Sequence, residues 1–233
     1  MIDLGSADFH FAVSGFGAPD LKRISNSIFD DWDATVASSL SLPDYSLALT
    51  VEEGSVKGVA KIGAAIGAIY MGIGNYGDFV SGLETINQQL RSAKSYVASH
   101  AAQAFACPTA NAKSRQRSGT LGALERLFKK VRRGELSPVE AASLAENLIG
   151  PEGDESQNFV QELRAAFGNC PKYPEQMGLD LGDSEEDQFF DSSSTIPRRP
   201  RRAPTPRDPS LHYRIEVWRD SRKKRKHTRV SRV

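Results

Sequence analysis

The sequence predicts an α+β protein, and three observations support this class. Residues 9–13 (FHFAV) are rich in aromatic and β-branched residues, as in a short strand. Residues 18–40 carry apolar side chains at helical spacing. Residues 46–61 alternate in the manner of a β-hairpin. The predicted order is therefore strand, helix and β-hairpin, within a body that covers residues 1–106.

The helix over residues 18–40 is predicted from its apolar positions. Leu21, Ile24, Ile28 and Trp32 fall on one side of a helix with 3.6 residues per turn. Asp20 precedes them and is the expected N-cap.

Strand alternation and a glycine turn predict the hairpin. Leu47, Leu49 and Val51 share one face of an extended strand. Residues 52–55 (EEGS) supply the turn, in which Gly54 is free to adopt a positive φ. Residues 56–61 form the returning strand.

A seven-residue repeat follows the hairpin. One apolar row consists of Ile62, Ile69, Tyr76, Leu83, Leu90 and Val97; a second consists of Ile66, Ile73 and Val80 and becomes polar at Asn87 and Lys94. Two rows separated by three and four residues are typical of a coiled coil. The pattern predicts a long Gly/Ala-rich helix, or two helices broken near residues 72–77. We expect self-association, as a homo-oligomer or with a protein partner, through Ile62, Ile66, Ile69, Ile73, Tyr76, Val80 and Leu83.

The glycines in this segment need an explanation, because each glycine inside a helix lowers the stability of that helix by roughly 1 kcal/mol relative to Ala. We expect the small residues to allow close packing against another element, at Ala60, Gly63, Gly67, Gly74 and Ser81. Residues 62–77 also lack charge, but a membrane span needs about 20 apolar residues. A buried helix packed on the hairpin is favoured, and membrane insertion of residues 58–77 is the alternative.

Residues 107–119 (CPTANAKSRQRSG) have the composition of a linker. A small helical unit is predicted over residues 120–170. Its apolar positions are Leu121, Leu124, Phe128 and Val131, then Leu144 and Leu148, then Phe159, Val160, Leu163 and Phe167. Ser137 and Glu140 match a capping box around Pro138, which predicts the start of the middle helix.

Residues 121–150 contain two short helical patterns around the turn GELSPVE at residues 134–140. This arrangement resembles the SHOCT module, in which two small helices flank a G-x-[ILV]-[ST]-x-x-E turn. The resemblance covers under a seventh of the chain. It implies oligomerisation and supplies no catalytic residues.

Charge is distributed unevenly along the chain. The last 39 residues contain 14 Lys/Arg and three acids, whereas the preceding 194 contain 16 Lys/Arg and 26 acids. Residues 171–210 are first acidic and then Pro- and Arg-rich, which predicts a disordered linker. Residues 211–218 alternate as a strand, either docked on the hairpin or formed only with a partner, and a disordered basic tail is expected to follow to residue 233.

This basic segment is the predicted functional region. We expect it to bind nucleic acid without sequence preference, or another polyanion, since phosphates attract Lys and Arg and aromatic rings stack on bases. The candidate contacts are Arg198, Arg199, Arg201, Arg202, Tyr213, Trp218, Arg222, Lys223, Lys224, Arg225 and Lys226. Anionic lipid is the alternative ligand for the same residues.

The sequence gives no positive sign of an enzyme, a cofactor or a metal site. Gly15 and Gly17 lie where a dinucleotide fingerprint would begin, but Asp20 occupies the third glycine position. An acidic cluster at residues 30–33 fits the solvated face of a helix better than a metal site. Two cysteines without paired spacing and an N-terminus without a secretory pattern favour the cytoplasm. The expected protein is a non-enzymatic binding or adaptor protein.

Overall fold

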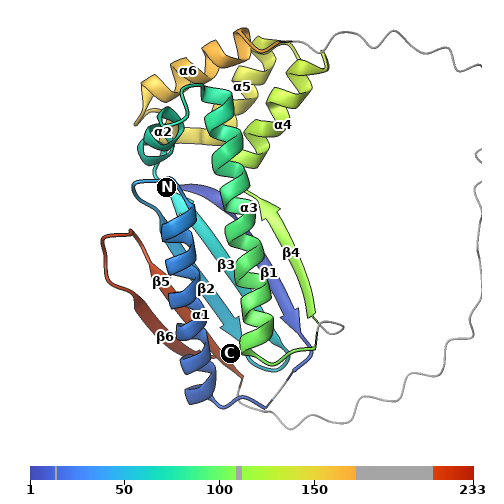
Figure 1. Ribbon diagram of the computed structural model, residues 1–233, viewed down its shortest axis with the longest axis vertical. Coiled ribbons are helices and arrows are strands. Elements are labelled where there is room, and N and C mark those ends of the chain that lie inside the picture. Colours follow the sequence, from blue (N-terminus) through green and yellow to red (C-terminus); the bar gives the residue numbers. More distant parts are fainter. Residues whose placement is uncertain (14, 109–111, 172–211) are drawn as a thin grey trace, which may run out of the picture.

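The computed structural model describes residues 1–13, 15–108, 112–171 and 212–233. The α+β class is confirmed: in these residues six α-helices accompany one six-stranded antiparallel sheet (Figure 1). The strands lie in the order β4-β1-β3-β2-β5-β6.

The centre of the sheet is made from the N-terminal part of the chain. β1 (Ile2–Phe11) pairs with β3 (Val56–Ala64), and β3 pairs with β2 (Ser46–Glu52). The predicted hairpin is confirmed, with Gly54 at a φ of 111° in its turn. β1 begins seven residues before the predicted strand at 9–13 and ends within it.

Three further strands complete the sheet. β5 (Tyr213–Arg219) pairs with β2, which confirms the strand predicted at residues 211–218 and its docking on the hairpin. The other two strands correct the sequence analysis: β4 (Ala112–Ser118) lies in the predicted linker and pairs with β1, and β6 (His227–Arg232) pairs with β5. The prediction of an unfolded basic tail after residue 218 is therefore wrong, because this segment completes a hairpin of the sheet. β4 and β6 are the two edges, where charged side chains are common and backbone hydrogen bonds define the strand.

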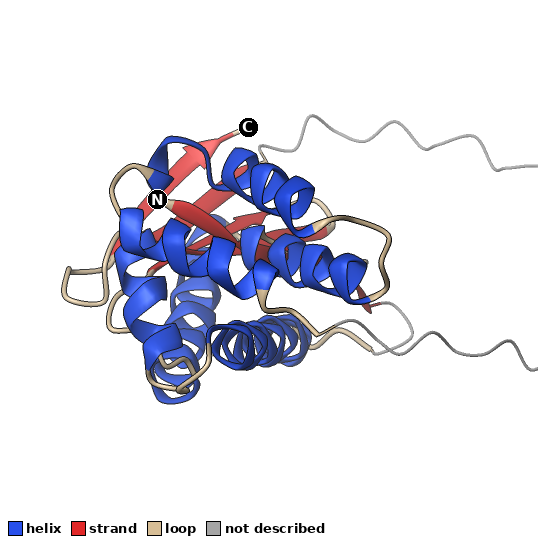
Figure 2. Ribbon diagram, turned by 90° about the horizontal axis from the view of Figure 1, so that it is seen from above, coloured by secondary structure: helices blue, strands red, loops and turns tan. Residues whose placement is uncertain are grey.

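Two helices cover one face of the sheet. α1 (Ala18–Ser39) and α3 (Phe79–Ala104) pack on each other and on the strands, as Figures 1 and 2 show. The N-cap of α1 is Gly17, not Asp20, which lies in the first turn.

The single long helix is not formed. Ile62 belongs to β3, a short helix α2 (Ile66–Gly74) follows, and α3 starts at Phe79 after an N-cap by Asp78. The predicted break near residues 72–77 is thus confirmed. The seven-residue repeat wrongly predicts a helix at Ile62. Ile62 and Ile66 are four residues apart, and this spacing fits one face of a strand as well as one face of a helix.

Close packing of α2 and α3 does depend on glycine, at positions other than those expected. A Cβ on Gly82 would lie 2.7 Å from the carbonyl oxygen of Ile73, and one on Gly72 would lie 2.5 Å from a methyl group of Leu42. A Cβ on Gly67 or Gly74 would meet nothing within 4 Å. The expectation of close packing at these two glycines is wrong.

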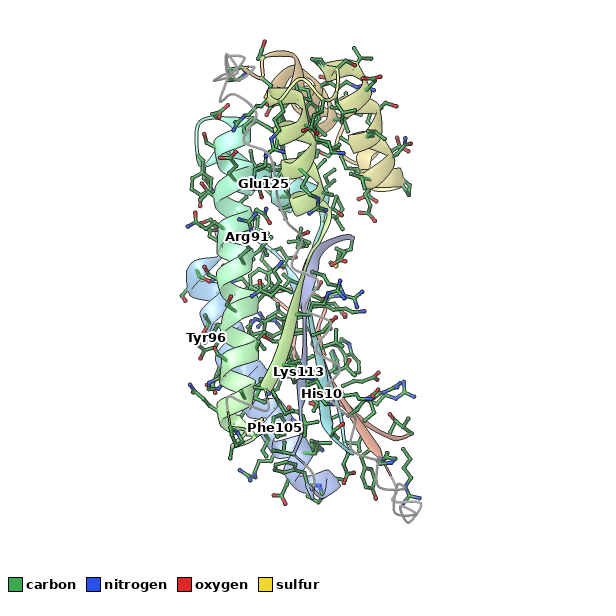
Figure 3. The ribbon with its side chains drawn as sticks, turned by 90° about the vertical axis from the view of Figure 1, so that its right-hand side faces the viewer. His10, Arg91, Tyr96, Phe105, Lys113 and Glu125 are labelled. Atoms are coloured by element: carbon green, nitrogen blue, oxygen red, sulfur yellow. The ribbon has the colours of Figure 1, made fainter. Side chains whose placement is uncertain are left out.

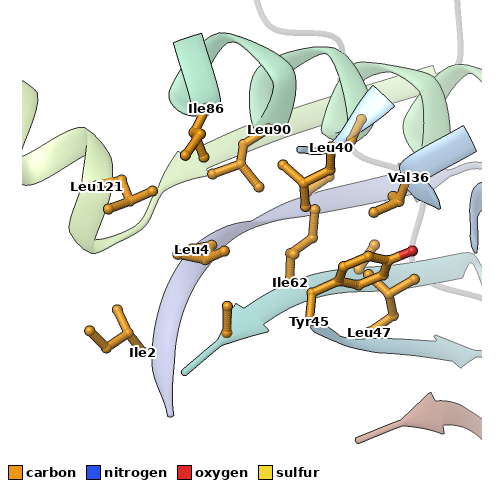
Figure 4. Packing of buried hydrophobic residues seen from close by; sticks show 14 of the residues in the cluster. Ile2, Leu4, Val36, Leu40, Tyr45, Leu47, Ile62, Ile86, Leu90 and Leu121 are labelled. Atoms are coloured by element: carbon orange, nitrogen blue, oxygen red, sulfur yellow. The ribbon is translucent and has the colours of Figure 1, made fainter. Parts of the chain in front are cut away.

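The predicted seam lies inside the core of the chain itself. Five of its seven members are at most 2% exposed, namely Ile62, Ile66, Ile69, Ile73 and Leu83. Tyr76 and Val80 are partly buried against the same core. Figure 4 shows this core between the sheet and the helices, with Ile62 near Tyr45 and with Ile86 and Leu90 on α3. These side chains therefore stabilise the fold of one chain.

The predicted helical unit is confirmed as three helices at one end of the sheet: α4 (Thr120–Arg132), α5 (Pro138–Ile149) and α6 (Gln157–Gly168), with a 3₁₀ turn (Gly150–Gly153) after α5. The capping box is present, with Ser137 Oγ accepting from the backbone N–H of Glu140 at 3.2 Å. The buried side chains of the unit belong to the same core as those of the body.

A polar cluster joins α4 to α3. Glu125 accepts hydrogen bonds from Asn87, from Arg91 at 2.6 Å and from Lys129 at 2.6 Å, and Figure 3 labels Arg91 and Glu125 at this junction. Burial acts to raise the pKa of Glu125, but hydrogen bonds from Lys129 and Arg91 hold it below its ordinary value. Lys94 is also buried and donates to the carbonyl of Arg117 at 3.0 Å. Asn87 and Lys94, the two polar residues in the second row of the seven-residue repeat, thus bind α4 and β4 to α3.

Candidate functional site

No helix among the described residues covers the second face of the sheet. Helices α1 and α3 lie along one side, and side chains from β1 and β4, including His10 and Lys113, project from the other (Figure 3). An antiparallel sheet can leave one face in water, with side chains alternating between core and solvent. We call this uncovered side the open face.

Strand register defines the open face as three rows of six residues. The first row is Lys113, His10, Lys57, Glu52, Arg214 and Ser231; the second is Arg115, Asp8, Val59, Thr50, Glu216 and Arg229; the third is Arg117, Ser6, Lys61, Ala48, Trp218 and His227. With strands about 4.8 Å apart, the rows extend roughly 24 Å across the sheet.

The open face is basic, with seven Lys/Arg against three acids. Two of its cations are neutralised, because Arg117 pairs with Asp8 at 2.9 Å and Arg214 pairs with Glu52 at 2.6 Å. Within the described residues the other five form no ion pair: Lys57, Lys61, Lys113, Arg115 and Arg229. By contrast, α1 on the covered side carries four Asp against two cations.

Trp218 is the aromatic residue of the open face. Its ring stacks on that of His227 across β5 and β6, with centroids 5.5 Å apart and planes 26° apart. Tyr213, the other aromatic residue among the candidate contacts, lies on the opposite face, because it is an odd number of residues from Trp218 on the same strand. Tyr213 packs against the core instead.

The predicted basic block forms the loop between β5 and β6. Its flanks are tied to the body: Arg219 pairs with Asp33, and Lys226 pairs with Asp30 at 2.6 Å. Four side chains between these ends, Arg222, Lys223, Lys224 and Arg225, are exposed and form no ion pair in the part of the chain described here.

Asp44 fastens the start of this loop. Its carboxylate accepts from Ser221 Oγ at 2.9 Å and from the backbone N–H of Arg222 at 2.8 Å. Burial acts to raise the pKa of Asp44, but these hydrogen bonds hold it below its ordinary value. The start of the loop is therefore fastened to the segment just before β2.

The acidic cluster of α1 has a structural role. Asp30 and Asp33 bind cations of the C-terminal hairpin, and Asp31 lies 2.9 Å from His100. The solvated-face interpretation is wrong for Asp33, whose side chain is only 20% exposed. Across the described segments, no group of three or more His, Cys, Asp or Glu side chains is placed to hold a metal ion.

Several predicted residues remain outside this description. Arg198, Arg199, Arg201 and Arg202 lie outside the described residues, as does most of the predicted linker at 171–210. None of the helices in the described segments has the length and apolar character needed to cross a bilayer. Segment 58–77, the alternative membrane segment, is divided between β3 and α2.

Comparisons with protein families, with curated proteins and with solved structures find no match for this chain.

The sequence analysis missed the open-face cations on β3 and β4. Their signal is a period of two: Lys113, Arg115 and Arg117 alternate with Ser114 and Gln116. Such alternation places three cations on one face of a strand. It was overlooked because alternation is normally sought among apolar residues.

Proposed function

We propose that this protein binds nucleic acid through its open face, without sequence preference. The observation that supports this most is the distribution of charge between the two sides of the sheet. Cations without ion-pair partners gather on the open face, while acids gather on α1 of the covered side. A phosphate backbone is the polyanion that best suits an extended basic surface with a partly exposed aromatic ring.

This proposal changes the location of the predicted contact. The C-terminal hairpin contributes Arg214, Trp218 and Arg229 to a surface whose other cations come from β3 and β4. The exposed loop residues Arg222, Lys223, Lys224 and Arg225 join the two strands of this hairpin and add four cations at the end of the sheet. The proposed binding surface is therefore a folded sheet, and the arginines at 198–202 are candidate contacts outside the described residues.

The test is a titration of a labelled mixed-sequence oligonucleotide with the full chain at several salt concentrations. A double variant, Lys57→Ala with Lys61→Ala, is compared with Lys22→Ala with Lys130→Ala, which removes the same charge from exposed positions on α1 and α4. Each phosphate contact on a single strand contributes about 0.7 to the slope of log affinity against log salt. The open-face variant should lose about 1.4 of that slope, and the control variant should lose none.

Equal slopes in the two variants would place the contact elsewhere. Vesicles that contain phosphatidylserine serve as a second ligand in the same assay. Binding to these vesicles with no measurable binding to the oligonucleotide would contradict the proposal and support the lipid alternative.

A further inference from the structure

A hollow of about 470 Å³ lies at one end of the open face. Its volume falls in the range of small-molecule sites, about 300–1,000 Å³. Trp218, Ala48 and Lys61 line it from three adjacent strands, together with Gly63. Asp3 and Asp220 lie at its rim.

Small residues create this hollow. In the third row of the open face, Ala48 separates the long side chains of Lys61 and Trp218. The neighbouring pair on the same two strands is Ser46 and Gly63, and a Cβ on Gly63 would lie 2.8 Å from Ser46 Oγ. Met1 also lines the hollow here, and its Sδ lies 3.0 Å from Ser46 Oγ.

The side chain of Trp218 forms one wall of the hollow and is held in place by its neighbours. His227, its neighbour on β6, stacks on the indole ring, and Ala48 is its neighbour on the opposite strand, β2. His227 is not among the residues that line the hollow. The stacked histidine thus supports the indole on one side, and the side next to Ala48 borders the hollow.

The charges around the hollow favour a base over a phosphate as its occupant. The Asp3 and Asp220 carboxylates would repel a phosphate, but they can accept hydrogen bonds from the amino and imino groups of a base. Lys61 lies both in the hollow and among the cations of the open face. The phosphates on either side of a base bound in the hollow would contact these cations. Base edges and faces are free for such contacts only in unpaired nucleotides.

We infer that this hollow binds one unpaired nucleobase, stacked on Trp218, so that the protein prefers single-stranded nucleic acid. The inference rests on the proposed function and adds the class of ligand. Phosphates contact the cation rows, and the base supplies the discrimination between single and double strands.

The experiment measures the affinity of the full chain for a single-stranded 12-mer and for a hairpin duplex of similar charge. Trp218→Ala should weaken single-strand binding about tenfold, which is within the range for loss of one base stacked on an aromatic ring. Trp218→Phe should stay within about threefold of the unchanged protein. Ala48→Leu fills the hollow and leaves Trp218 in place, and it should weaken single-strand binding as Trp218→Ala does.

Ala34→Leu is the matched control. It makes the same substitution at an exposed position of α1, on the covered side of the sheet and outside the residues that line the hollow. This variant should bind the 12-mer as the unchanged protein does. Thermal unfolding of each variant confirms that the sheet is intact.

Two results separate the failure of this inference from failure of the proposed function. If Trp218→Ala and Ala48→Leu bind the 12-mer normally while Lys57→Ala with Lys61→Ala does not, the hollow holds no base and the open face still binds nucleic acid. If the unchanged chain binds neither the 12-mer nor the duplex, the proposed function fails and the inference fails with it.

Discussion

Arg219 on β5 forms an ion pair with Asp33 on α1, 186 positions away in the sequence. The two side chains are only 14% and 20% exposed. Burial raises the pKa of Asp33 above its ordinary value, although the charge of Arg219 acts to lower it. This pair lies on the covered side of the sheet and holds the C-terminal hairpin against α1.

We expect Arg219→Met to lower the free energy of unfolding by about 1–3 kcal/mol, because it leaves a shielded carboxylate without its charged donor. Urea unfolding measures the change. Arg23→Met is the control, since Arg23 pairs with Asp20 on the exposed side of the same helix and should contribute under about 0.5 kcal/mol. Equal losses in the two variants would show that the hairpin does not depend on the shielded pair.

Asp44→Ala should loosen the hairpin locally. The substitution removes the acceptor for Ser221 Oγ and for the backbone N–H of Arg222, each a hydrogen bond to a charged group. Amide hydrogen exchange should accelerate in β5 and β6 and stay slow in β1. Unchanged protection of β6 would mean that Asp44 does not fasten the loop.

Glycine packing between α2 and α3 gives a matched pair of variants. Gly82→Ala should destabilise the protein by about 1–3 kcal/mol, because the new Cβ meets the backbone of Ile73, which has no room to move. Gly67→Ala meets open space and should leave stability unchanged, or raise it by up to about 1 kcal/mol through helix propensity. Thermal unfolding compares them, and equal melting temperatures would contradict the close approach at Gly82.

Glu125 should make stability depend on pH in the acid range. Its pKa is lower in the folded protein than in the unfolded chain, where it is about 4.3. Its contribution is therefore complete above that value and is lost as the pH falls through the folded pKa. Urea unfolding from pH 6 to pH 3 should show this decline. The decline should be shallower in Glu125→Gln, and an unchanged profile would show that Glu125 does not contribute.

Local sequence signals predicted the elements that depend on local chemistry. The hairpin turn at Gly54 and the capping box of Ser137 and Glu140 are both present. Each needs only residues a few positions apart. The break between α2 and α3 was also predictable, because glycines cluster there.

Two strands with few apolar residues were not predicted. β4 is stabilised by hydrogen bonds to β1, which lies far away in the sequence, and β6 by hydrogen bonds to its neighbour β5, so neither shows the apolar alternation of a half-buried strand. The open face could not be recognised either. Its Lys and Arg side chains come from β3, β4, β5 and β6 and are brought together by strand register. Within a single strand, only the alternation of Lys113, Arg115 and Arg117 on β4 indicates this face.

The most direct test of the open face is to map where a nucleic acid touches the chain. A single-stranded oligonucleotide with photoreactive bases is cross-linked to the full protein, and the attached residues are identified by mass spectrometry. We expect attachment at the open face, chiefly at Trp218, Lys61 and Lys57. Attachment confined to helices α1 and α3–α6, or to the arginines at 198–202, would contradict binding by the sheet.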